Sequence, residues 1–152
     1  MSIDARLTEL GITLPTVSAP AGAYIPAIIS GNLVFTAGQL PFVDGALPET
    51  GKLGAGVDAD AAKGYARIAA LNALAAVESV IGSLDRVTRI VKVVGFVASD
   101  PSFTGQPGVI NGASEVLGEI FGEAGKHARS AVGVAVLPLD SPVEVELIVE
   151  FA

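Results

Sequence analysis

The side chains best suited to chemistry gather in the last segment of the chain, residues 126–152. Arg129 follows the basic residues Lys126 and His127, in a chain whose formal net charge is −7. Arginine presents a planar, permanently charged fork that matches a carboxylate. Glu144 lies in the alternating run V-E-V-E, where a glutamate can orient a water molecule and move a proton. The segment therefore predicts either anion binding with hydrolytic chemistry, or a surface salt bridge beside a solvated acidic strand face.

Other catalytic motifs are absent from the sequence. It has no Gly-rich phosphate loop, no HExxH motif and no cysteine, and one histidine is too few for a usual zinc site. A serine triad built on His127 and Ser130 has no further support. We therefore expect neither a metal nor a cofactor. The absence of cysteine also fits a cytoplasmic protein.

The composition is that of a small apolar domain. With 152 residues, 51% of them hydrophobic and 16% charged, the chain is long enough for one domain with a hydrophobic core. It contains no run of ~18 consecutive apolar residues, so we expect no transmembrane helix and no membrane partner. The beginning lacks the basic and apolar regions of a secretion signal. The negative charge argues against a nucleic-acid partner, and the apolar excess predicts a homo-oligomer.

Two strands are predicted in the first third of the chain. The apolar runs 27–30 and 33–37 flank Gly31-Asn32, a pair typical of a tight hairpin. The second run leads into T-A-G-Q-L-P at 36–41, where Gly and Pro end the strand and leave backbone groups exposed. Residues 42–56 are rich in Gly and Pro and predict a surface loop.

Two helices are predicted further along. Asp58 can cap the first, which runs to about residue 81 or 82 with Ala and Val at helical spacing. Asn72 lies on its apolar side, so we expect it to be buried and hydrogen-bonded. Pro107 suits the first turn of the second helix, where Asn111 is solvated, a local cap partner or a ligand contact.

The remaining strands complete one sheet. Residues 87–98 predict a central strand with Gly95 as a candidate bulge, and the last segment predicts a hairpin around the turn 137–142. The order β-β-α-β-α-β-β indicates an α+β fold, in which both helices cover one face of a single mixed or antiparallel sheet. We expect the other face, with side chains such as Ala131 or Val143, to meet another subunit.

The predicted hairpin sets a distance between the two candidate groups. Glu144 would lie opposite a residue near Val136, and Arg129 lies about seven residues further along. At ~3.3 Å per residue the separation exceeds ~20 Å. One hairpin could not bring both groups to one small substrate, so a shared site requires neighbouring subunits.

Several segments together resemble the RidA/YjgF family of enamine and imine deaminases, also described as endoribonuclease L-PSP proteins. They are Tyr24 in an early loop, T-A-G-Q-L-P, Asn111, and A-R-S-A-V followed by L-P and V-E-V-E. The resemblance spans about Ser18 to Ala152. It leaves residues 1–16 as an N-terminal extension of a single domain, 1–152. It implies a chorismate-mutase-like fold and a homotrimer with ligand clefts between subunits.

The resemblance also implies an activity. This is the hydrolysis of reactive 2-imino acids such as 2-iminobutanoate, or their enamine tautomers, to 2-oxo acids and ammonia, without metal or cofactor. By resemblance, Arg129 binds the carboxylate of a small substrate and Glu144 positions the attacking water. The cleft would be lined by Tyr24, Ala37, Gly38, Asn111 and Ala131, with the two alanines contributing backbone groups.

The chain departs from the family pattern at two places near Arg129. Ala131 stands where many of the deaminases have a cysteine that is not the nucleophile, and typical members have a proline near the arginine, where this chain reads G-K-H-A-R. A second hypothesis therefore stays open: a regulatory trimer that binds small carboxylates without catalysis. His127 is either a ligand contact or a surface or interface residue, and Tyr24 is either a packing aromatic or a lid. Ribonuclease activity, also attached to the family, fits an acidic chain poorly.

Overall fold

The structure, a computed structural model, describes residues 1–17, 20 and 22–152. Ser18, where the family resemblance begins, lies outside the described residues. The helices are α1 (Ile3–Glu9), α2 (Ala59–Ile81) and α3 (Gln106–Phe121), with short 3-10 turns η1 (Leu84–Arg86), η2 (Gly122–Gly125) and η3 (Pro138–Asp140). The strands are β1 (Ala27–Ser30), β2 (Leu33–Thr36), β3 (Lys52–Leu53), β4 (Gly56–Val57), β5 (Val87–Ala98), β6 (Ala128–Val134) and β7 (Val143–Phe151).

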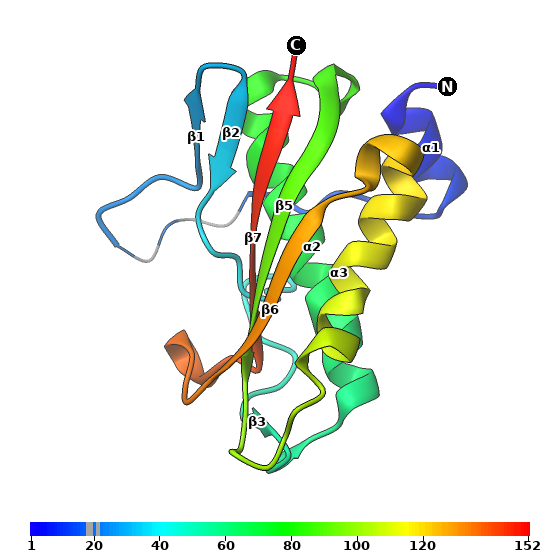
Figure 1. Cartoon of the computed structure of the whole chain (residues 1–152). Helices are drawn as coiled ribbons and strands as arrows, with labels where there is room; N and C mark the ends of the chain where they lie inside the picture. The colour runs from blue at the N-terminus through cyan, green and yellow to red at the C-terminus, as the bar shows by residue number, and fades with distance from the viewer. Residues whose placement is uncertain (18–19, 21) are drawn as a thin grey trace.

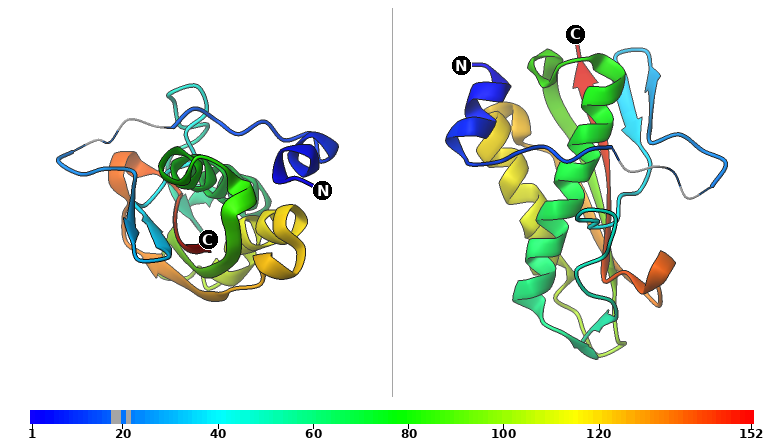
Figure 2. Two further views of the ribbon diagram at one scale, coloured as in Figure 1. Left: turned by 90° about the horizontal axis from the view of Figure 1, so that it is seen from above. Right: turned by 180° about the vertical axis from the view of Figure 1, so that it is seen from behind.

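One sheet organises the described part of the chain. Its strand order is β1-β2-β7-β5-β6; β5 and β6 are parallel, and the other neighbours are antiparallel. Helices α2 and α3 pack side by side on one face of this sheet, and within the described residues the other face carries no α-helix (Figures 1 and 2). The predicted α+β fold with a mixed sheet is therefore confirmed, as is the hairpin of β1 and β2.

The prediction that the last two strands form a hairpin is wrong. Strand β5 lies between β6 and β7 and pairs with both. The chain leaves β6, crosses the end of β5 through residues 135–142, and enters β7 (Figure 1). Alternating apolar residues indicate a strand but not the strand with which it pairs, so two strands joined by a crossover show the same pattern as a hairpin. The length of the connection was the available signal, because tight hairpins use two to five residues.

The two faces of the sheet were also assigned wrongly. Val143 is fully buried and packs in the core beneath the helices, and Ala131 packs against the same core. The open face instead carries Ile28, Phe35 and Val132, which are 56%, 38% and 43% exposed. These side chains lie on the face that α2 and α3 leave uncovered, so an apolar surface remains there.

Helix α2 follows its sequence prediction closely. The Asp58 carboxylate accepts a hydrogen bond from the Ala61 backbone N–H at 3.0 Å, and Gly82 ends the helix with a φ of 88°. The side chain of Asn72 is buried, as expected, and its amide donates to the carbonyl groups of Leu40 and Phe42. Among the described helices, α2 is long and apolar enough to span a membrane, but 56% of its most apolar 18-residue stretch is buried inside the domain. It therefore serves as the core helix of the fold.

Strand β5 confirms the predicted element but not the predicted bulge. Its irregularities lie between Val87 and Arg89 and between Ile90 and Lys92, not at Gly95. Gly95 instead admits helix α3, because a Cβ there would stand 2.5 Å from the side chain of Ile110. The glycine serves a close approach between helix and strand.

Two segments outside the main sheet also pack into the domain. Residues 42–56, predicted as a surface loop, include β3, which pairs with β4, and Leu53 in β3 is fully buried. Helix α1 packs against α3, its Leu7 is buried in the hydrophobic core, and Arg6 donates from Nε to the Glu119 carbonyl at 2.8 Å. The N-terminal helix is thus part of the packed domain.

Candidate functional site

Three of the predicted site residues meet in one pocket on the open side of the sheet. Tyr24, Gly38 and Glu144 line a cavity of about 180 Å³, together with Pro138 and Leu139 of the η3 turn. Ala37 directly precedes Gly38 in the sequence and so lies next to this pocket. A larger cavity of about 640 Å³, between residues 13–17 and the loop around Asp44, contains none of the predicted site residues. The smaller pocket is therefore the candidate site.

The backbone after β2 brings Gly38 onto Glu144. The Thr36 hydroxyl accepts a hydrogen bond from the Leu147 N–H of β7 at 2.9 Å, and Gln39 then exchanges two backbone hydrogen bonds with Val145. Gly38 lies between these two anchors. A Cβ at Gly38 would stand 2.5 Å from Glu144 Oε1, so only glycine leaves room for the carboxylate. The T-A-G-Q segment thus forms a wall of the pocket that follows the shape of Glu144.

The carboxyl group of Glu144 is electrostatically unusual. It is half-buried, and burial, with a further contribution from the nearby Glu146, raises its pKa above the ordinary glutamate value. In the described part of the chain, no lysine, arginine or histidine forms an ion pair with it. A carboxylate with a raised pKa is a better proton acceptor near neutral pH, as a general base requires.

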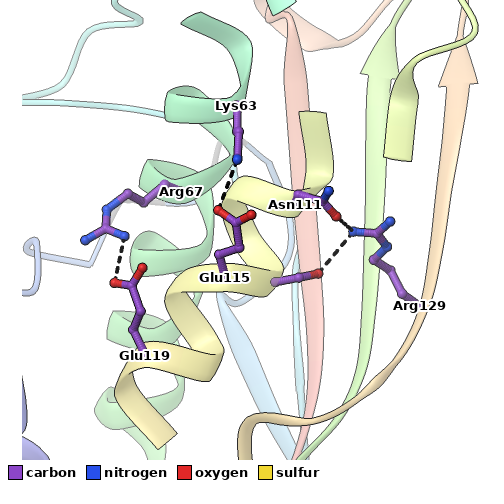
Figure 3. Close-up of polar contacts among 7 residues, drawn as sticks. Lys63, Arg67, Asn111, Glu115, Glu119 and Arg129 are labelled. Atoms are coloured by element: carbon purple, nitrogen blue, oxygen red, sulfur yellow. Dashed lines mark hydrogen bonds and ion pairs between the residues drawn. The ribbon is translucent and has the colours of Figure 1, made fainter. Parts of the chain in front are cut away.

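Arg129 lies in a second cluster, between β6 and α3. Its Nη1 donates to Asn111 Oδ1 at 2.8 Å and to Ser114 Oγ at 3.2 Å (Figure 3). Among the described residues, no carboxylate lies within ion-pair distance of its guanidinium. The acids of α3 turn elsewhere: Glu115 pairs with Lys63 and Glu119 with Arg67, both on α2 (Figure 3). Arg129 therefore keeps its charge available for an anion.

The two clusters do not form one site within the chain. Arg129 is in register with Val93 of β5, and Glu144 is in register with Phe96. This offset of three residues and two strands corresponds to about 14 Å between backbone positions. Arg129 projects on the face that packs against α3, whereas Glu144 alternates with buried Val143 and Val145 and projects on the open face. The distance of more than ~20 Å expected from a hairpin is wrong, but opposite faces still keep the two groups apart.

Some members of these clusters were missed at the level of sequence. Ser114 follows Asn111 by three residues on α3 and so shares its face of the helix, a spacing that the sequence offered. His127 is close enough to Ser114 for a hydrogen bond, with 2.9 Å between His127 Nε2 and Ser114 Oγ.

The structure also places two residues that flank Arg129. Ala131 lies two residues beyond Arg129 on β6, in register with Gly95. Lys126 pairs with Glu123 at 3.0 Å.

Comparisons with known proteins identify relatives over almost the whole chain. A family model described as YjgF/chorismate mutase-like, putative endoribonuclease, matches residues 4–151. Protein TCP17 from Trypanosoma cruzi is 45% identical over 149 residues, which cover 97% of this chain and 93% of that protein. A 2-iminobutanoate/2-iminopropanoate deaminase from Escherichia coli K12 is 31% identical over 140 residues, covering 90% of this chain and 94% of the deaminase.

A solved structure shares the same fold. The crystal structure of a putative endoribonuclease from Shewanella oneidensis MR-1 superposes with a TM-score of 0.96 at 36% identity, covering 99% of this chain and 100% of that one. The match of the family model, the identity to the deaminase and the shared fold agree with one another. The chain belongs to the RidA/YjgF family, whose model is described as YjgF/chorismate mutase-like.

Proposed function

We propose that the protein hydrolyses 2-imino acids, or their enamine tautomers, to 2-oxo acids and ammonia in the cytoplasm. The observation that carries the proposal is the pairing of two unusual groups. Glu144 has a half-buried carboxyl group with a raised pKa and lines a small pocket. The guanidinium of Arg129 is oriented by hydrogen bonds to Asn111 and Ser114 and has no carboxylate partner among the described residues. The 31% identity to a protein named 2-iminobutanoate/2-iminopropanoate deaminase supports the choice of reaction.

The proposed active site forms between subunits of a homotrimer. Opposite faces of the sheet separate Arg129 from Glu144 within one chain, so Arg129 of one subunit would complete the pocket of Glu144 in the next. The exposed side chains of Ile28, Phe35 and Val132 supply an apolar surface that such an assembly would cover. The number of three subunits follows from the family resemblance. Sedimentation equilibrium tests it, and a monomer at working concentration would contradict it.

In the proposed mechanism Arg129 holds the substrate carboxylate while Glu144 moves protons. Glu144 accepts a proton from water as the water oxygen bonds to the carbon of the protonated imine and the C=N electron pair moves to nitrogen, which gives a neutral carbinolamine. The protonated carboxyl then returns that proton to the amino nitrogen. Glu144 next takes the hydroxyl proton as the C=O bond forms and the C–N bond breaks. Ammonia leaves and is protonated, and the 2-oxo acid remains. Positioning supplies most of the catalysis, because the imine carbon is already electrophilic.

The test is ammonia release from freshly generated 2-iminopropanoate or 2-iminobutanoate. We expect the wild type to exceed the spontaneous rate, and Arg129→Ala to raise KM by about 100-fold, since it removes a charged two-point contact. If the wild type and Arg129→Ala both match the spontaneous rate, the protein is not an imine deaminase. Saturable binding of 2-oxo acids without acceleration would favour the regulatory, non-catalytic alternative.

A further inference from the structure

Arg129 belongs to a chain of hydrogen bonds that continues beyond its immediate partners. Its Nη1 lies 3.2 Å from Ser114 Oγ, which lies 2.9 Å from His127 Nε2. His127 Nδ1 in turn lies 2.7 Å from the carbonyl oxygen of Gly125. The members come from α3, the η2 turn and the segment that leads into β6, so the chain ties three parts of the fold to one guanidinium.

The donor and the acceptor of each hydrogen bond in this series can be assigned from the chemistry of the groups. A carbonyl oxygen only accepts, so Nδ1 of His127 carries the hydrogen and donates to Gly125. A guanidinium only donates, so Ser114 Oγ accepts from Arg129. In a neutral imidazole that is protonated on Nδ1, Nε2 is an acceptor, and the Ser114 hydroxyl donates to it. The serine hydrogen therefore points at His127, and a serine lone pair points at Arg129.

This arrangement leaves one edge of the guanidinium unoccupied. Asn111 Oδ1 and Ser114 Oγ both accept from Nη1 and account for its two hydrogens. Within residues 1–17, 20 and 22–152, Nε and Nη2 of Arg129 make no hydrogen bond or ion pair. Those two nitrogens form the side-on edge that matches both oxygens of a carboxylate. The orientation of Arg129 is thus set from one edge, and the opposite edge is available to a ligand.

We propose that Ser114 and His127 are positioning residues for the carboxylate site. Through Nη1 they hold Arg129 so that its Nε–Nη2 edge meets the substrate, and they thereby set the affinity for the carboxylate rather than the rate of proton transfer. The inference rests on the proposed function, because it takes Arg129 as the carboxylate ligand. His127 accordingly does not contact the ligand.

The Ser114–His127 contact also has the geometry of a nucleophile beside a base. A nucleophilic serine would need its oxygen free to attack, but Arg129 donates to that oxygen, and Ser114 lies inside α3 rather than at an exposed turn. A fluorophosphonate probe separates the two roles. We expect no covalent labelling of Ser114; stoichiometric labelling that Ser114→Ala removes would overturn the positioning role.

The main test compares binding and turnover in matched variants. Calorimetry with 2-oxobutanoate gives Kd, and ammonia release gives KM and kcat. We expect Ser114→Ala to raise Kd and KM about tenfold, with kcat within about twofold, because a hydrogen bond to a charged group is lost on the binding side alone. His127→Phe should raise both about threefold. Ser114→Thr and His127→Gln, which retain the hydroxyl and an acceptor, should restore most of the affinity.

Ser79→Ala is the control, because the Ser79 hydroxyl bonds only within α2, to the Ala76 carbonyl. It should leave all three constants unchanged. If Ser114→Ala binds and turns over substrate as the wild type does, the positioning role is wrong while the proposed function stands. If the wild type neither binds 2-oxobutanoate nor accelerates the reaction, the proposed function fails instead.

A spectroscopic test does not depend on activity. The chain has one histidine, so the imidazole nitrogens of His127 give a single pair of NMR signals. We expect the tautomer protonated on Nδ1 in the wild type near neutral pH. A dominant Nε2–H tautomer would make Nε2 the donor to Ser114 and leave Nδ1 without a hydrogen for the Gly125 carbonyl, and it would overturn the proposed hydrogen-bond chain even in an active enzyme.

Discussion

Gly38 allows the position of the proposed base to be changed by a single methyl group. A Cβ at Gly38 would stand 2.5 Å from Glu144 Oε1 and 2.7 Å from its Cδ, whereas ordinary contact begins at 3.4 Å. The carboxylate of Gly38→Ala must therefore move by about 1 Å. The φ angle of Gly38 lies outside the left-handed range, so alanine can adopt the same backbone.

We expect Gly38→Ala to lower kcat by about 100-fold, because a displacement of about 1 Å can cost that much in a positioned reaction. KM should change little, since Arg129 is untouched. Stability should also change little, because the half-buried Glu144 carboxylate can move toward solvent, where its charge is better hydrated.

The assay pairs ammonia release with urea unfolding at one protein concentration. Gly64→Ala is the matched control, because Gly64 is exposed on α2 and a Cβ there meets no atom within 4 Å. It should keep the wild-type kcat and gain about 0.5–1 kcal/mol of stability, as alanine does over glycine in a helix. A folded Gly38→Ala variant with the wild-type kcat would refute the role given to the Glu144 carboxylate.

Three further changes test the electrostatics and the packing. Glu144→Gln should lower kcat at least about 100-fold. It should also be more stable than the wild type at pH 7, because burial and Glu146 raise the folded-state pKa and the ionised carboxyl costs stability. In urea unfolding this gain should vanish below pH 4.5, the ordinary glutamate pKa, because Glu144 is then protonated in both the folded and the unfolded wild type. A gain that persists there would contradict the raised pKa as its cause. Asn72→Ala should lose about 2 kcal/mol in urea unfolding, since the carbonyl groups of Leu40 and Phe42 lose their donor, and a loss under about 0.5 kcal/mol would contradict a stabilising role for these two hydrogen bonds. Gly95→Ala should lose about 1–3 kcal/mol by forcing Ile110 from the sheet, and unchanged stability would show that α3 can shift freely.

The elements of the fold were largely predictable from sequence, but the partners of the last strands were not. Caps and spacing located α2 and α3, and Gly31-Asn32 located the first hairpin, because these signals are local. Period-2 alternation in residues 126–152 gave both strands. It could not reveal that β5 inserts between them, since that choice depends on contacts far apart in sequence.

The site divides in the same way. The identities of Arg129, Glu144 and Gly38 came from motifs and family resemblance, and the structure places Gly38 against Glu144. The sheet face on which each side chain lies was harder to predict. Ile90 and Val93 are three residues apart, a spacing that puts side chains on opposite faces of a regular strand, but the irregular pairing of β5 puts both in the core. The Ser114–His127 contact joins residues on different elements, so no local pattern announces it.

A mixture of two variants, each impaired about 100-fold when the substrate is well below the wild-type KM, tests most directly whether Arg129 and Glu144 of different subunits form one site. Equal amounts of Arg129→Ala and Glu144→Gln subunits would be unfolded together, refolded and assayed for ammonia release. If each site takes Arg129 from one subunit and Glu144 from its neighbour, random assembly restores both groups in about a quarter of the sites. We therefore expect about a quarter of the wild-type rate. A mixture no more active than the two variants assayed separately would contradict the shared site.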